Sequence, residues 1–214
     1  MRLIQRGLFL FKKTVIGLSL ALACISSASN AQGFAASESS VQIHSQQNLT
    51  SQQQRAFAEF QSEAPFFGAF YVSANGAYSW IRDINTLEAA KIVAQVSCEE
   101  HGAACSLYAS IVPNVPEGRE AFDKLAMSEV QRAFLWIRSN QGKSSGAAMA
   151  ASGYWGYHTA VRGAGVRRAE RDALRECRSR LDEFVRDQLS PQQVAALQQA
   201  DLYDCRIIVS IRER

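Results

Sequence analysis

Two pairs of short, mainly apolar runs are separated from the polar stretches around them, and each pair flanks a turn dipeptide. Asn75-Gly76 is the strongest short-range hairpin signal, because both central residues of a type I′ turn need positive φ. Ser152-Gly153 is a weaker form of the same signal. The pattern therefore predicts two β-hairpins. Their strands are expected at 66–73 and 77–82 for the first hairpin, and at 147–151 and 154–159 for the second.

After each hairpin the pattern predicts one helix and one strand. In the first case Asn85 and Glu88 have the spacing of an N-cap and N3 pair, and in the second the helix is expected to begin near Val166. β-branched runs at 107–112 and 207–211 then predict a closing strand. A small side chain recurs at every fourth position on one face of each helix, and a cysteine ends the series: Ala90, Ala94 and Cys98, then Ala169, Ala173 and Cys177.

A shorter helix is expected before each hairpin, so that the same series of elements occurs twice. Ser51 with Gln54, and Ser128 with Gln131, have capping-box spacing, and the second pair follows the first at an offset of 77 in the numbering. This offset continues through the hairpins, and we place a two-residue insertion between the second hairpin and its helix. The prediction is an α+β fold of two αββαβ repeats, with antiparallel sheets, or one continuous sheet, carrying helices on one face.

The repeats define the predicted organisation of the chain. Ser190 and Pro191 suit the N-cap and N1 positions of an additional helix in the second repeat. Residues 32–47 are rich in Ser, Gln and Ala and show no apolar period, so we interpret them as a flexible leader. The segments are 1–31 signal peptide, 32–47 leader, 48–113 repeat 1, 114–125 connector, and 126–214 repeat 2 with a helical insertion at 179–201.

The segment 1–31 has the three parts of a secretory signal peptide. Basic residues precede an apolar run of about ten residues, which is too short to span a membrane. Small residues then lead to Ala31, after which we expect cleavage. Cys24 offers the alternative of a lipid anchor, although Ala21 is a poor match to that motif. The mature chain is predicted to be periplasmic or secreted, with no transmembrane segment, and the source is expected to be bacterial.

The formal net charge of +3 comes from the predicted signal peptide. Removing its four basic residues leaves 19 Lys and Arg against 20 Asp and Glu. A mature charge close to −1 gives no reason to expect nucleic acid or an anionic membrane as a partner.

Four cysteines remain after the expected cleavage, an even number that is typical of exported proteins. Four cysteines allow three pairings, and the repeat selects Cys98 with Cys105 and Cys177 with Cys205. Each pair then joins the end of a helix to the start of the next strand. The spacing is unlike that of a zinc site, and only His101 lies near any of them in the sequence, so we expect no bound metal.

Four aromatic residues near the hairpin turns alternate at period two. Tyr78 and Trp80, and likewise Trp155 and Tyr157, are therefore expected to share one face of each hairpin. They are interpreted either as a binding stripe or as core side chains that fill the space opposite the helix alanines. The core interpretation is favoured.

Other candidate residues point to no identifiable catalytic chemistry. His44, His101 and His158 do not converge in the sequence, and no phosphate-binding, dinucleotide-binding or zinc-protease motif is present. Arginines crowd the expected helix that begins near Val166, and we interpret them as a solvated, partly self-paired face, with an anion site as the alternative. We predict no catalytic residue and no cofactor. The candidate binding residues are Trp80, Trp155, Tyr157, His158, Arg167 and Arg168.

With its hairpin, its Ala-x3-Ala-x3-Cys helix and its Cys-led strand, the chain resembles small secreted bacterial domains of unknown function. The resemblance covers 67–112 and about 147–211. It implies export and disulfides, and it implies no particular chemistry. We expect a binding or inhibitory module of the cell envelope whose partner is another envelope or secreted protein. A secreted enzyme and a structural envelope component are the alternatives.

Overall fold

The computed structural model describes residues 39–62, 67–101, 104–113, 137, 146–161 and 165–212. The expected signal peptide, the connector and the first helix of repeat 2, apart from Ile137, lie outside these residues. The described elements form an α+β fold with antiparallel sheets, as predicted. They are β1 (Ser39–Ile43), α1 (Ser51–Ser62), β2 (Phe67–Val72), β3 (Tyr78–Ile84), α2 (Leu87–Glu99), β4 (Ser106–Pro113), β5 (Gly146–Ala151), β6 (Tyr157–Val161), α4 (Val166–Gln188), α5 (Pro191–Gln199) and β7 (Arg206–Arg212).

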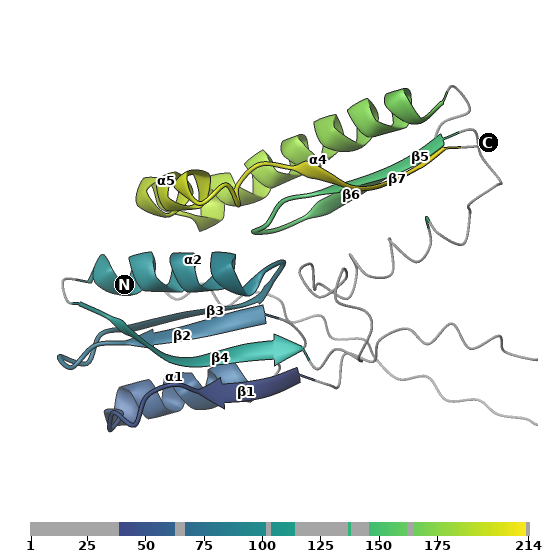
Figure 1. The fold of residues 1–214 in the computed structure, drawn as a ribbon. Helices are drawn as coiled ribbons and strands as arrows, with labels where there is room; N and C mark the ends of the chain where they lie inside the picture. The colour runs from purple at the N-terminus through teal and green to yellow at the C-terminus, as the bar shows by residue number, and fades with distance from the viewer. Residues whose placement is uncertain are drawn as a thin grey trace, which may run out of the picture. The chain divides into compact units, whose positions relative to one another are not determined.

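The first sheet, sheet A, has the strand order β1-β4-β2-β3 and a helix on each face (Figure 1). Side chains of β2 alternate between the two faces. Ala69 and Tyr71 pack with the alanines of α2 in the largest hydrophobic core, whereas Phe70 and Val72 pack with Phe60 of α1. The expectation of helices on one face only is therefore wrong for this sheet.

Strand β1 lies in a segment where the sequence pattern predicted a flexible leader. It pairs antiparallel with β4, with Val41 opposite Ile111. Val41 packs against the core beneath α1. Three of the other four residues of this edge strand are polar, and the fourth, Ile43, is 53% exposed. A short polar edge strand has no apolar period, so the pattern could not reveal it.

The second sheet, sheet B, has the strand order β6-β5-β7. Helix α4 covers one face, where Ala148 and Ala150 of β5 lie in the same core as the small residues of the helix, Ala169 and Ala173. On the other face Met149 packs with Ile137. Small residues on both elements allow a close approach of helix and sheet.

Both hairpins are present, with turns that differ from the predicted ones. In the first, Ser73 N donates to Ala77 O at 2.9 Å, and only Gly76 of the turn has positive φ, at 94°. This is the three-residue loop with glycine in the left-handed region, and the predicted type I′ turn is wrong. In the second, β6 begins at Tyr157 and not at Tyr154, because residues 152–156 form a longer connection.

The helix caps lie close to the predicted positions. Ser190 caps α5 in a capping box with Pro191 at N1, as predicted. For α2 the N-cap is Thr86, whose side chain accepts from Ala89 N, and not Asn85. For α1 the reciprocal bonds join Thr50 and Gln53, one residue before the predicted pair, Ser51 and Gln54: Gln53 N donates to Thr50 Oγ1 at 3.3 Å, and Thr50 N donates to Gln53 Oε1 at 2.9 Å.

The predicted disulfides are confirmed, Cys98 with Cys105 and Cys177 with Cys205. Each joins the helix that follows a hairpin to the start of the next strand. None of the helices among the described residues is long and apolar enough to cross a lipid bilayer.

Candidate functional site

A groove of about 420 Å³ lies beside β3, one of the two edge strands of sheet A. One side consists of residues 79–84, together with Val93 and Ser97 of α2. Tyr154 and Trp155, from the connection between β5 and β6, form part of the other side. The C-terminal end of α4 and the start of α5 complete it with Phe184, Gln188, Leu189 and Gln193. The groove therefore needs both the first and the second sheet with their helices.

The backbone of β3 is open toward this side, because β3 is an edge strand among the described residues. Ser73 N donates to Ala77 O across the hairpin, and hydrogen-bonded pairs alternate along an antiparallel ladder. The pairing register therefore directs the peptide groups of Ser79 toward β2. The peptide groups of Tyr78 and Trp80 point away from β2, toward the open edge of the sheet. The outer edge of β3 presents donors and acceptors that another extended chain could use.

Trp155 and Phe184 form a stacked pair on the opposite side of the groove. Their ring centroids lie 3.8 Å apart with an interplanar angle of 5°. Ser152 fixes the position of the tryptophan, since its hydroxyl donates to Trp155 O at 2.7 Å and accepts from Trp155 N at 2.9 Å. Both rings remain partly exposed. Together they offer a flat, preformed aromatic surface.

Two charged residues lie at the β3 side of the groove. The guanidinium of Arg82 lies 5.2 Å from the ring centroid of Trp80, and its Nη1 donates to Glu59 O at 3.0 Å. Asp83 has a φ of 63°, which is uncommon for a residue other than glycine. A register irregularity in the β2–β3 ladder lies at this end of the strand, where Phe67 pairs with Ile84. Such an irregularity redirects side chains at a sheet edge.

Asn85 holds the connection between β5 and β6 beside the end of β3. Its backbone N donates to Tyr154 O at 2.9 Å, and its Nδ2 donates to Ser152 O at 2.9 Å and to Gly156 O at 3.0 Å. The side chain is fully buried, and its Oδ1 accepts no hydrogen bond from the residues that the structure describes. Asn85 thus contributes to positioning Trp155 over the groove.

Tyr154 is the titratable group whose pKa is most strongly shifted in the groove lining. Burial raises the pKa of its hydroxyl well above the ordinary value of 10, so the group stays protonated at neutral pH. Within the described part of the chain, no three His, Cys, Asp or Glu side chains are grouped so that they could hold a metal ion.

The structure brings two of the predicted binding residues, Trp80 and Trp155, to one groove. Tyr157 instead packs with Met149 on the face of sheet B that α4 does not cover. His158 lies in β6, and its side chain is outside the described ones. The remaining two candidates, Arg167 and Arg168, are exposed on α4 and do not line the groove. The other two histidines lie apart from it, since His44 bonds Ser110 Oγ and His101 bonds Ser97 O, each at 2.8 Å.

The prediction that each aromatic pair shares one face of its hairpin and fills the space opposite the helix alanines is only partly correct. Tyr78 and Trp80 do share a face, but that face packs with α1 and not with the alanines of α2. Trp155 and Tyr157 lie in different clusters, because Trp155 precedes the strand and its direction is set by the turn. Sequence reasoning also missed Phe184 as the partner of Trp155. The sequence shows Phe184 only as an apolar position within the predicted insertion 179–201, and its stacking partner lies earlier in the chain, before the helix.

Comparison of the chain with protein-family models, with curated protein sequences and with solved structures finds no match.

Proposed function

We propose that the mature chain is an exported binding module whose groove takes an extended segment of a partner polypeptide. The observation that carries this proposal is the open edge of β3 beside the stacked rings of Trp155 and Phe184. An added strand would gain backbone hydrogen bonds from Tyr78 and Trp80. Its alternate side chains would contact the aromatic surface. This is the β-augmentation mode of peptide recognition, in which backbone bonds give affinity and pockets give specificity.

Export is supported by the two disulfides. Disulfides persist in oxidising compartments such as the periplasm and the extracellular space, and they are rare in the cytosol. Both lie in the sheet-and-helix framework that surrounds the groove, since Cys98 and Cys177 are buried in its main core. A framework closed in this way holds a binding surface rigid and lowers the entropy lost on binding.

We also propose that the framework arose by duplication of one unit. In each sheet the strand after the helix pairs with the first strand of the hairpin, giving β4-β2-β3 and β7-β5-β6. The hairpin, the helix after it and the cysteine of that helix in the first unit correspond to those of the second unit at an offset of 79 residues. Phe67 thus corresponds to Gly146, and Cys98 to Cys177. At an offset of 77, Ile137 takes the position of Phe60. The two-residue insertion thus lies before the second hairpin and not after it. The resemblance to small secreted domains belongs to this proposal.

The test is selection of short peptides from a random library on the purified mature protein. We expect extended sequences with an apolar residue at alternate positions. N-methylation of alternate amides should abolish the binding of a selected peptide, because each methyl group removes a hydrogen bond that strand addition needs. Methylation of the intervening amides should be tolerated. A selected peptide that binds equally well in every methylated form would contradict strand addition.

The matched protein variants are Trp155→Ala and Tyr157→Ala, which lie close in the sequence but on different sides of the framework. Loss of an aromatic anchor from a binding site typically costs about 2 kcal/mol or more, which is roughly a 30-fold or greater loss of affinity. We expect that loss for Trp155→Ala, and unchanged binding for Tyr157→Ala, measured by fluorescence polarisation of the labelled peptide. An equal effect of both substitutions would place the binding site elsewhere.

A further inference from the structure

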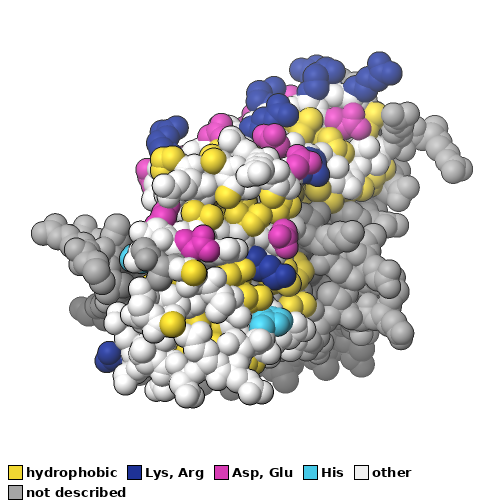
Figure 2. Space-filling model, turned by 60° about the vertical axis from the view of Figure 1, so that its left-hand side comes forward, with side chains coloured by type: hydrophobic (Ala, Val, Ile, Leu, Met, Phe, Trp, Pro, Cys, Tyr) yellow, Lys and Arg dark blue, Asp and Glu magenta, His cyan; other side chains and the backbone are white. Residues whose placement is uncertain are grey.

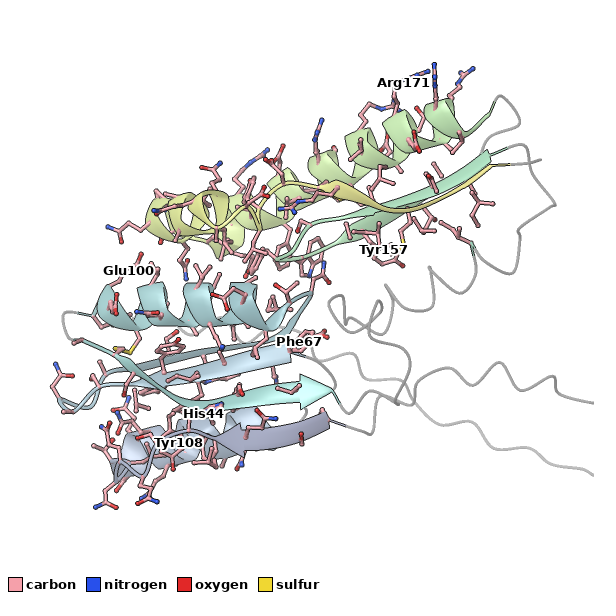
Figure 3. The ribbon with its side chains drawn as sticks, in the orientation of Figure 1. His44, Phe67, Glu100, Tyr108, Tyr157 and Arg171 are labelled. Carbon is pink, nitrogen blue, oxygen red and sulfur yellow. A yellow bond between two sulfur atoms is a disulfide. The ribbon has the colours of Figure 1, made fainter. Side chains whose placement is uncertain are left out.

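Helix α4 carries a concentration of arginines on the side that faces away from sheet B. In Figure 2 most of the Lys and Arg side chains in view lie along the upper edge of the molecule. Figure 3 shows Arg171 pointing away from the sheet. Five of these arginines define what we call the arginine face. They are Arg167, Arg168, Arg171, Arg175 and Arg178, and all five are exposed.

The arginine face is exposed and partly self-paired, as the sequence pattern predicted. Within the described part of the chain, Arg175 alone of the five forms ion pairs, to Asp172 Oδ1 at 3.0 Å and to Glu176 Oε1 at 3.1 Å. Among the described residues the other four arginines have no carboxylate within salt-bridge distance. Their charges are therefore available to an external partner.

Helix geometry places the five side chains in one stripe. At 3.6 residues per turn they fall within an arc of about 100°, and they extend for about 16 Å along the axis. The acidic residues of the same stretch, Glu170, Asp172 and Glu176, fall outside this arc on its two flanks. The charge of the mature chain is nearly balanced overall, but it is segregated here.

The shape and chemistry of this face exclude most kinds of partner. Neither the groove beside β3 nor a second one beside α1 includes any of its residues, so it is not part of a pocket for a small anion there. No aromatic side chain lies within the arc, whereas protein–protein interfaces depend on buried aromatic or apolar anchors. The apolar face of α4 is already buried against the core, so the helix cannot insert into lipid. What remains is adsorption to an extended anionic surface through guanidinium groups, which suit phosphate.

We infer that the arginine face docks on an anionic phospholipid bilayer. Each basic residue near an anionic membrane contributes about 1 kcal/mol, or about fivefold in binding. Four unpaired arginines on one stripe are enough for reversible, salt-sensitive adsorption. The proposal does not depend on the function of the groove, which lies at the other end of α4, around Phe184.

The test uses the purified mature protein and two kinds of vesicle, one of phosphatidylcholine alone and one in which phosphatidylglycerol replaces a third of it. Binding is followed by co-sedimentation. We expect binding only to the vesicles that contain phosphatidylglycerol, and weaker binding at high salt, because salt screens exposed charges. In the double variant Arg171→Glu/Arg178→Glu, binding should fall by about 25-fold or more, given about fivefold per charge. The matched control is Arg180→Glu on the same helix, which is exposed and has no ion pair among the described residues but lies outside the arc and should bind like the wild type.

Circular dichroism melts of all variants establish that the helix is intact. Absence of vesicle binding by the wild type would overturn the proposal. An equal loss in Arg180→Glu and in the double variant would overturn it too, since adsorption would then depend on net charge alone. Arginine-dependent binding to polyglutamate without vesicle binding would assign the face to an acidic protein and not to a membrane.

Discussion

Tyr154 combines two backbone hydrogen bonds with a buried side chain. Its backbone O accepts from Asn85 N at 2.9 Å, and its own N donates to Leu202 O at 3.1 Å. The ring is 1% exposed and lies 6.3 Å from that of Phe184, centroid to centroid. Burial of the hydroxyl makes its ionised form costly, and this is why its pKa is raised.

Stability should therefore fall at alkaline pH. A raised folded-state pKa means that the folded protein holds the tyrosine proton more tightly than the unfolded chain does. This stabilisation is complete below about pH 10 and is lost as the pH rises, by up to about 1.4 kcal/mol per pH unit. Urea unfolding at pH 8 and pH 11 measures the loss. Tyr154→Phe should show a smaller loss than the wild type. Tyr71, whose pKa is raised by burial and then by Glu88 and Glu99, and Tyr203, whose pKa is raised by burial and then by Asp182, contribute to the remainder.

At the scale of elements, Gln53 attaches α1 to the first hairpin. Its Nε2 donates to Ser73 O at 3.1 Å and to Ala77 O at 3.0 Å. These two residues come directly after β2 and directly before β3, at the hairpin turn. Its Oε1 accepts from Thr50 N. The side chain is fully buried, whereas the next residue, Gln54, is exposed.

Gln53→Ala should destabilise the protein by about 2–4 kcal/mol, because it removes both hydrogen bonds from the buried Gln53 amide to the hairpin turn and part of the capping box. Gln54→Ala removes one exposed hydrogen bond to Leu49 O and should cost less than about 1 kcal/mol. Denaturant unfolding of the pair measures the difference. Equal effects would mean that the turn is not held by Gln53.

The elements that the sequence predicted correctly depend on local signals. The hairpins and the Ser190-Pro191 helix start follow from residue types at short spacing. The pairing of the two disulfides was predicted from the recurrence of the same elements along the chain. Strand β1 could not be predicted, because its pairing partner β4 is distant in the sequence and its own residues are mostly polar. The groove likewise depends on contacts such as Trp155 with Phe184, and no local pattern indicates which distant side chains will meet. The sequence therefore indicated two of the groove residues without indicating the groove.

At the scale of the whole molecule, the two sheets are joined by polar and apolar contacts together. The largest core includes residues of both sheets and of α2, α4 and α5, and Gln193 Nε2 donates to Val93 O at 3.1 Å between α5 and α2. Asn85 adds three hydrogen bonds to the connection between β5 and β6. We expect these contacts to make the two sheets and their helices unfold as one cooperative unit.

Asn85→Ala should lower the free energy of unfolding by about 2–4 kcal/mol, because the carbonyls of Ser152 and Gly156 stay buried without their donor. Asn48→Ala, at an exposed position, is the control and should have little effect. Chemical denaturation followed by tryptophan fluorescence checks both. A separate early transition in Asn85→Ala would show that one sheet with its helices unfolds on its own when this contact is lost.

The order of the disulfides along the chain determines what oxidative folding requires. Each bridge joins cysteines that are consecutive among the four in the described part of the chain, at separations of 7 and 28 residues. A chain that emerges from its N-terminus exposes Cys98 and Cys105 well before Cys177, so each cysteine meets its native partner first. Oxidation in order of appearance then gives the native pairing. The protein should need a thiol oxidase for its maturation, and no disulfide isomerase.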